Sequence, residues 1–316
     1  MRKVIHSYIK DKADMKAFLD NFNLGSEGVI IKPNWTSRDY GFYTDAESLE
    51  LLLSNIEGKK YIVESYMYGR TDGSIKMDSS NGFENWEYLK EQDRRFLEIS
   101  GMGELLQKYN AEYINITEEW WSGRTAASSE IQKIVEEKYK PVNHTELYGM
   151  VPEKLLELRN LPLISYSKIK YTLPSVTNFS SLAMKNIFGL IPIPNREYYH
   201  GSDFDSGLSR SIVDILTIYK ALFRVIGICE GIYRIPVTRE EGKNKYKMLW
   251  TDYDVIEDMG IILGSEDIVT LDAYTNKLIG LNTETRAVLK IGEEVFGKWD
   301  RDEVGYITEE MIKPFK

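Results

Sequence analysis

Short apolar runs alternate with helical patterns through the first 117 residues. Leucines at helical spacing lie between the first two runs, after Thr44 and Glu47, whose spacing is that of a capping box. A second helical pattern covers residues 93–110. Strand, helix, strand, helix, strand is the order of a parallel sheet with right-handed crossovers. The predicted strands cover residues 29–31, 59–65 and 111–117.

The same alternation resumes after a polar stretch, residues 118–160, in which helical patterns dominate. The sequence therefore predicts an α/β fold with two lobes, each built on a mostly parallel sheet, and a cleft between them. The N-terminal lobe covers residues 1–117, the helical connection 118–160 and the C-terminal lobe 161–316. Within the C-terminal lobe, strands are predicted at 161–170, 224–231 and 259–267, and helices at 180–191, 208–223 and 267–280.

Composition and charge narrow the class of protein. The chain has 316 residues, 42% of them hydrophobic, which is enough for a sizeable core. A net charge of −9 argues against a nucleic-acid surface, because duplex binding depends on neutralising phosphates. The most apolar segment, residues 211–233, is interrupted by Asp214, Lys220 and Arg224, so it does not read as a membrane span. With no apolar leader at the N-terminus, we expect a cytoplasmic protein without nucleic-acid or membrane partners.

The single cysteine, Cys229, can form neither an internal disulfide nor an iron–sulfur cluster by itself. We therefore expect no internal iron–sulfur cluster. The sequence also has no zinc-ligand spacing, no P-loop and no dinucleotide-binding glycine motif. Any catalytic chemistry must therefore depend on side chains that do not form one of these motifs.

Polar side chains gather where the predicted strands end, and ligands of open parallel sheets bind at that edge. Lys32 and Asn34 follow the first strand, and Lys168 and Lys170 end the strand that starts the C-terminal lobe. Each residue also has a structural interpretation, because lysines reach solvent from strand ends and acids cap helices or pair with cations. The acids at such ends are Glu64, Glu230 and Asp267.

Taken in order, six segments resemble the domain-of-unknown-function 362 family over roughly residues 28–282. These segments are "VIIKPNW", "LPLISYSKIK", "LAMKNIFGLIP", "SRSIVDILTIYK", "VIGICEGI" and "ILGSEDIVTLDAY". The chain departs from that family at Thr172, where a histidine is common, and at Glu230, where an aspartate is common. It also lacks the cysteine-rich ferredoxin module of many relatives. The resemblance nominates Lys32, Asn34, Lys170, Lys185, Asn186, His200, Glu230, Asp267 and Asp272 as site residues.

Together these residues predict a cationic floor that suits a carboxylate or phosphate. We expect Lys170, Lys185 and His200 to be catalytic, since desolvation beside other cations lowers a lysine pKa toward that of a general base or imine former. Binding of the anion is assigned to Lys32, Asn34, Lys168 and Asn186, and Glu64, Glu230 and Asp267 are candidate ligands of Mg²⁺ or partners of the lysines.

The first functional hypothesis is an enzyme that acts on a small anionic metabolite by lysine and histidine acid–base chemistry, with Mg²⁺ as a candidate cofactor. The alternative hypothesis is a redox accessory or binding protein that works with a separate ferredoxin-like iron–sulfur partner. The ordered lysine, asparagine and histidine set favours the enzyme, whereas the ferredoxin modules of relatives favour the accessory protein.

Overall fold

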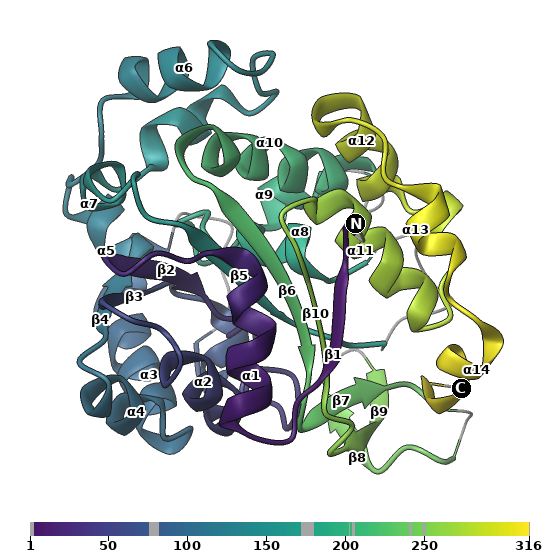
Figure 1. Ribbon diagram of the computed structural model, residues 1–316. Helices are drawn as coiled ribbons and strands as arrows, with labels where there is room; N and C mark the ends of the chain where they lie inside the picture. The colour runs from purple at the N-terminus through teal and green to yellow at the C-terminus, as the bar shows by residue number, and fades with distance from the viewer. Residues whose placement is uncertain are drawn as a thin grey trace.

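The architecture is that of a computed structural model, which describes residues 3–75, 82–171, 180–201, 203, 206–239, 242–248 and 251–315. Its central feature is a seven-stranded sheet with the order β1-β10-β6-β5-β2-β3-β4 (Figure 1). The five strands from β6 to β4 run parallel, and β10 and β1 are antiparallel additions at the other edge. The strands are β1 (Ile5–Tyr8), β2 (Gly28–Lys32), β3 (Lys59–Glu64), β4 (Glu112–Asn115), β5 (Leu163–Lys168), β6 (Val225–Gly231) and β10 (Ile261–Ser265).

The predicted α/β class and the mostly parallel sheet are confirmed, but the strands of the two predicted lobes belong to one sheet. Strand β2 pairs in parallel with β5, with Ile30 opposite Leu163 and Lys32 opposite Ser165. Every residue of both strands is buried, as expected for central strands covered on both faces. The predicted cleft between two sheets is thus replaced by a ladder of backbone hydrogen bonds.

Helices cover both faces of this sheet. Val29 and Ile31 face a core formed with the first four helices, whereas Ile30 faces the core formed with the later helices. In Figure 1 the first group lies at the lower left, and the later helices lie toward the top and the right. The first group is α1 (Lys12–Leu19), α2 (Ala46–Leu53), α3 (Trp86–Ile99) and α4 (Met102–Lys108).

The second face carries the helices that follow β4. These are α5 (Ile116–Trp121), α6 (Ser128–Glu136), α7 (Glu153–Glu157), α8 (Ala183–Phe188), α9 (Glu197–His200), α10 (Ser206–Leu222), α11 (Ile268–Leu278), α12 (Ala287–Phe296), α13 (Arg301–Gly305) and α14 (Glu309–Ile312). Short 3-10 helices complete the chain, at Asp20–Phe22, Tyr68–Arg70, Phe83–Asn85, Thr145–Met150, Thr283–Thr285 and Lys313–Phe315. None of the helices in the described ranges has the length and apolar character needed to cross a membrane.

A small antiparallel sheet, which the hydrophobic pattern did not predict, lies below the main sheet in Figure 1. It consists of β7 (Arg234–Val237), β9 (Thr251–Glu257) and β8 (Tyr246–Met248). Tyr253 and Val255 of β9 pack with Phe42 from the loop after β2 in a separate apolar cluster. This cluster places the β2 loop beside the end of β5, where the candidate site lies.

The close contact between β6 and two helices gives a stability prediction. A Cβ atom on Gly227 would lie 2.7 Å from Leu271 Cδ2 and 3.0 Å from Ile268 Cγ1, both on α11. We expect Gly227→Ala to lower the free energy of unfolding by about 1–3 kcal/mol through overpacking. The measurement is urea unfolding of purified protein.

Gly305→Ala is the matched control, because no described atom lies within 4 Å of a Cβ added there and the residue ends helix α13. This change should leave stability unchanged or raise it by about 0.4–1 kcal/mol. Equal stability of the two variants would contradict the packing argument.

Candidate functional site

Asn186 joins the two central strands to helix α8 at the carboxyl end of the sheet. Its Nδ2 donates to the backbone oxygen of Lys32 at 2.8 Å and to Ser165 Oγ at 3.2 Å. Its Oδ1 accepts from Asn34 Nδ2 at 3.2 Å and lies 3.5 Å from Lys32 Nζ. The side chains of Lys32, Asn34 and Asn186, which the sequence predicts as one group, are therefore in direct contact.

The ammonium group of Lys32 is fully buried and paired. Its Nζ lies 2.5 Å from Glu64 Oε1 at the end of β3 and donates to the backbone oxygen of Pro33 at 2.7 Å. Burial lowers the pKa of Lys32 to about 8, although the Glu64 carboxylate opposes the change. The second oxygen of Glu64 lies 3.7 Å from Arg70, so this carboxylate serves two buried cations.

Lys168, the last residue of β5, belongs to a second buried ion network. Its ammonium group contacts Asp45 and lies 3.1 Å from Glu230 Oε1, and its side chain is 0% exposed. Asp45 also accepts from Arg234 Nη1 at 2.6 Å. Lys168 is predicted to bind an anion, but two carboxylates already pair with its ammonium group, and a ligand would have to compete with them.

Lys170 has a different environment. Its Nζ donates to Asn34 Oδ1 at 2.6 Å and lies 3.4 Å from the backbone oxygen of Phe42. Within the described part of the chain, no carboxylate lies within ion-pair distance of it. Burial, and then the charges of Lys185, Lys168 and Lys32, hold the pKa of Lys170 well below its usual value. The environment of Lys170 therefore disfavours its protonated form.

Lys185 and His200 extend this group toward the surface, and both side chains are partly exposed. Burial, and then the Arg196 charge, lower the pKa of Lys185 to about 8. Burial also lowers the pKa of His200 to about 4, and Lys185 and Arg196 add to this shift. The imidazole stacks on Phe188 with ring centroids 5.9 Å apart. His200 is thus a neutral base near neutral pH.

Arg196 and Arg70 are buried members of the site that the sequence analysis missed. Arg196 contacts Ser65 Oγ and donates to the backbone oxygens of Gly189 and Ile191, and burial lowers its pKa to about 10. Arg70 contacts Asp93 of α3. Neither arginine lies at the end of a predicted strand, so neither belongs to the set of residues that the sequence pattern predicts. The "NRE" turn after helix α8 gave no stronger signal.

Helix α8 is fixed by a buried carboxylate from α11. Asp272 accepts from the backbone N–H groups of Ala183 at 2.9 Å and Met184 at 3.0 Å. Burial raises the pKa of Asp272 to about 7. At the other end of α8, a Cβ on Gly189 would lie 2.8 Å from Lys32 Nζ, so a larger residue there would displace that ammonium group. Asp272, nominated by the family resemblance, therefore positions the helix that carries Lys185.

The three predicted Mg²⁺ ligands do not come together. Asp267 follows β10, which runs antiparallel to its neighbours. It therefore lies beside the amino ends of the parallel strands, at the end of the sheet opposite the lysines. There it accepts from the backbone N–H of Thr270 as the N-cap of α11 and lies 3.7 Å from Lys3 Nζ. Glu64 and Glu230 are separated by β2 and β5. Within the described ranges no group of three acidic, histidine or cysteine side chains is arranged to hold a metal ion.

Two other sequence predictions change or fall outside the structure. Thr44 does not cap helix α2, because its Oγ1 accepts from the backbone N–H of Asn34 at 2.8 Å, and Asp45 is the N-cap residue. Cys229 is buried, and burial raises the pKa of its thiol to about 12. Thr172, where the chain departs from the resembling family, lies outside the described residues.

The fold and this site define an α/β protein with buried lysines at the carboxyl edge of a parallel sheet. A family model described as "Domain of unknown function (DUF362)" matches residues 29–277, and the chain belongs to this family. The resemblance seen in the sequence is thereby confirmed. No curated protein and no solved structure matches the chain.

Asp272→Asn tests the support of helix α8. An asparagine offers one acceptor and places an amide N–H against a backbone N–H, so we expect a loss of about 1–3 kcal/mol in the free energy of unfolding. Because the folded-state pKa is raised from 3.8 to about 7, the folded protein binds more protons than the unfolded chain between these values. The stability from this proton is complete below pH 3.8 and is lost as the pH rises through 7.

The wild-type advantage over Asp272→Asn should therefore be larger at pH 5 than at pH 8, as measured by urea unfolding at both values. Asp302→Asn, a change at an exposed residue of α13, is the control and should cost little. An advantage that grows from pH 5 to pH 8 would contradict the raised pKa of Asp272.

Proposed function

We propose that the protein is an enzyme that binds a small carboxylate or phosphate metabolite beside Lys185 and uses Lys170 and His200 as proton acceptors. The observation that carries this proposal is the environment of Lys170, which has amide and carbonyl oxygens as partners and three lysines as electrostatic neighbours. A lysine kept only for stability would be paired with a carboxylate, as Lys168 is.

The hydrogen bonds of Lys170 suit a general base. A neutral amine has two N–H donors and one lone pair, and among the described residues its acceptors are Asn34 Oδ1 and the Phe42 carbonyl oxygen. This arrangement leaves the lone pair to accept a proton from the substrate. The residue is 9% exposed, so it lies near the surface but is largely shielded from water. Proton transfer to Lys170 Nζ would produce an ammonium group that the bound anion stabilises.

Lys185 and Arg196 provide the positive charge for the anion. Lys185 is partly exposed, whereas Arg196 is buried and holds backbone oxygens, so direct contact is assigned to Lys185 and a supporting field to Arg196. His200 lies in the field of both cations, and a bound anion would raise the pKa of its imidazole from about 4. The imidazole then becomes able to return a proton to the product.

The proposal keeps the cytoplasmic location that the sequence predicts. The alternative, an accessory protein for a separate ferredoxin-like partner, stays a prediction based on the family resemblance. It requires no anion affinity at Lys185, so anion binding separates the two hypotheses.

Lys185→Met is the direct test. Methionine keeps the length and helix propensity of lysine and removes the charge. We expect anion affinity to fall by about 1.5–3 kcal/mol, the worth of a hydrogen bond to a charged group. The free energy of unfolding should stay the same or rise, because the change removes a positive charge that repels the neighbouring cations and lowers the pKa of Lys170 and of His200. Melting curves with small carboxylates and phosphates identify a binding anion, and titration calorimetry then measures its affinity.

Lys290→Met, at an exposed position of helix α12, is the control and should change neither quantity. If both variants bound the anion as tightly as the wild type, Lys185 would be a surface lysine without a role in binding.

Anion binding should also weaken as the pH rises from 7 to 9. Burial lowers the pKa of Lys185 to about 8, so its ammonium group loses its proton within this range. An anion favours the protonated form, and affinity should fall by up to about tenfold per pH unit above 8 for each proton taken up. Calorimetry in two buffers of different ionisation enthalpy measures that proton uptake. Constant affinity across the range would contradict the assigned pKa.

A further inference from the structure

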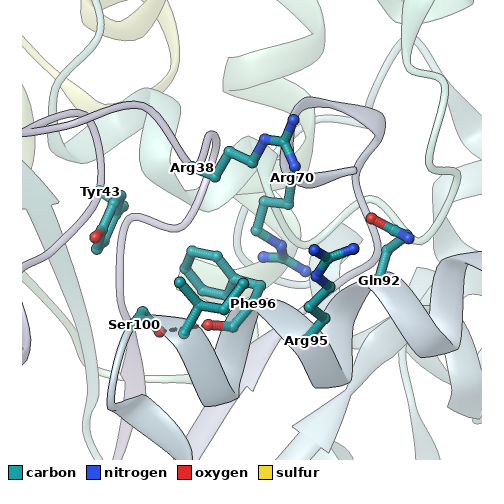
Figure 2. Close-up of a pocket in the computed structure, with 8 residues that line it drawn as sticks. Arg38, Tyr43, Arg70, Gln92, Arg95, Phe96 and Ser100 are labelled. Carbon is teal, nitrogen blue, oxygen red and sulfur yellow. Dashed lines mark hydrogen bonds between the residues drawn. The ribbon is translucent and has the colours of Figure 1, made fainter. Parts of the chain in front are cut away.

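A pocket of about 260 Å³ lies between helix α3 and the loop that follows β2 (Figure 2). Its lining is distinct from the residues around Lys170 and Lys185. The loop contributes an arginine and a tyrosine, the 3-10 helix after β3 contributes an arginine, and α3 supplies most of the rest. The main lining residues are Arg38, Tyr43, Arg70, Gln92, Arg95 and Phe96.

Arg70 forms the buried part of this lining, and its hydrogen bonding is incomplete. Nη1 donates to the backbone oxygen of Trp35 at 2.8 Å, and Nη2 donates to the backbone oxygen of Ser65 at 2.8 Å and contacts Asp93. The buried Nε has no hydrogen-bond partner among the described residues. Buried donors are nearly always paired, so this one marks an unmet demand for an acceptor beside the pocket.

Two exposed arginines flank Arg70. In Figure 2 the side chain of Arg70 lies between those of Arg38 and Arg95. Arg95 lies 4.0 Å from Asp72, a long contact for an ion pair. Within the described ranges Arg38 makes no hydrogen bond or ion pair, so its guanidinium group is held by no carboxylate. The rim of the pocket therefore carries positive charge that ion pairs among the described residues do not fully neutralise.

The pocket also has an apolar wall. The rings of Tyr43 and Phe96 meet edge to face with centroids 5.5 Å apart, and Ile99 on the same helix is 74% exposed. Guanidinium groups beside aromatic rings suit a ligand with an oxyanion at one end and an apolar group at the other.

We propose that this pocket is a second binding site, for a small phosphate or carboxylate that carries an aromatic or branched apolar group. The oxyanion lies between Arg38 and Arg95, where guanidinium groups bind such oxygens in pairs, and the apolar group lies against Phe96 and Ile99. This inference stands apart from the function proposed for Lys170 and Lys185, because neither lysine lines this pocket, although Arg70 lines it and also pairs with Glu64 of the first site.

Phenyl phosphate is the probe, with benzoate as the carboxylate form and inorganic phosphate and benzyl alcohol as its separate halves. Titration calorimetry should give saturable binding of phenyl phosphate or benzoate, at least about tenfold tighter than either half. In the Arg38→Gln/Arg95→Gln double variant, this affinity should fall about tenfold or more. Both positions are exposed, so the fold should be retained, as melting curves would verify.

Arg94→Gln is the matched control, because Arg94 is the neighbour of Arg95, is exposed, and pairs with Glu91 and Glu98 away from the pocket. It should bind phenyl phosphate like the wild type, and so should Lys185→Met, which separates this site from the first. Absence of binding, or equal affinities in the double variant and in Arg94→Gln, would overturn the proposal. Inorganic phosphate that bound as tightly as phenyl phosphate would overturn the role of the apolar wall.

Discussion

At the carboxyl ends of the parallel strands, the structure depends on how cationic side chains are stabilised away from water. An unpaired buried charge costs several kcal/mol, so each ammonium or guanidinium group there needs compensating oxygens. Glu64 supplies them to Lys32 and Arg70, and Asp45 and Glu230 supply them to Lys168. These carboxylates come from β3, from the residue before α2, and from β6. The ion pairs therefore tie neighbouring strands and the β2 loop into one arrangement.

The arrangement at the carboxyl ends of the strands also depends on the position of helix α8. Residues that do not contact the lysines fix that position. Asp272 on α11 holds the first backbone N–H groups of α8, and Ser165 Oγ on β5 donates to the backbone oxygen of Ala183 at 2.8 Å. Gly227 allows α11 to approach β6, and through α11 it influences where α8 begins. Packing on the helical face of the sheet thus determines where Asn186 and Lys185 lie relative to Lys32.

The sequence predicted the local elements better than their assembly. Apolar runs identified β2, β3 and β5 because a buried strand leaves a continuous hydrophobic signal. Pairing between β2 and β5 involves residues more than a hundred positions apart, and hydrophobic periodicity carries no information on such partners. The composition of β10 does not reveal its direction either. The sequence prediction therefore placed Asp267 at the carboxyl ends of the parallel strands, whereas it lies at their amino ends.

Within the site, lysines at strand ends were found because a charged residue stands out in an apolar run. Their partners were harder to assign, since a carboxylate near a strand end reads equally well as a cap, a metal ligand or an ion-pair partner. Glu64 and Glu230 turned out to pair with Lys32 and Lys168. Arg196 lies between α8 and α9, where an arginine looks like a surface residue, and only its contacts with the Phe188 ring and with the backbone oxygens of Gly189 and Ile191 account for its burial.

Charge balance explains why one lysine differs from the others. Lys32, Lys168, Arg70 and Arg196 are buried cations, and Glu64, Asp93, Asp45 and Glu230 are the buried carboxylates near them. These buried groups balance four to four, and the partly exposed Arg234 shares Asp45 with Lys168, so another protonated lysine beside them adds charge that no described carboxylate neutralises.

Protonation of Lys170 is therefore disfavoured, in agreement with the lowered pKa of this residue. A bound anion would supply the missing negative charge and make protonation favourable. In the proposed function, the amine takes up a proton when the anion is bound, which is the property that a general base requires.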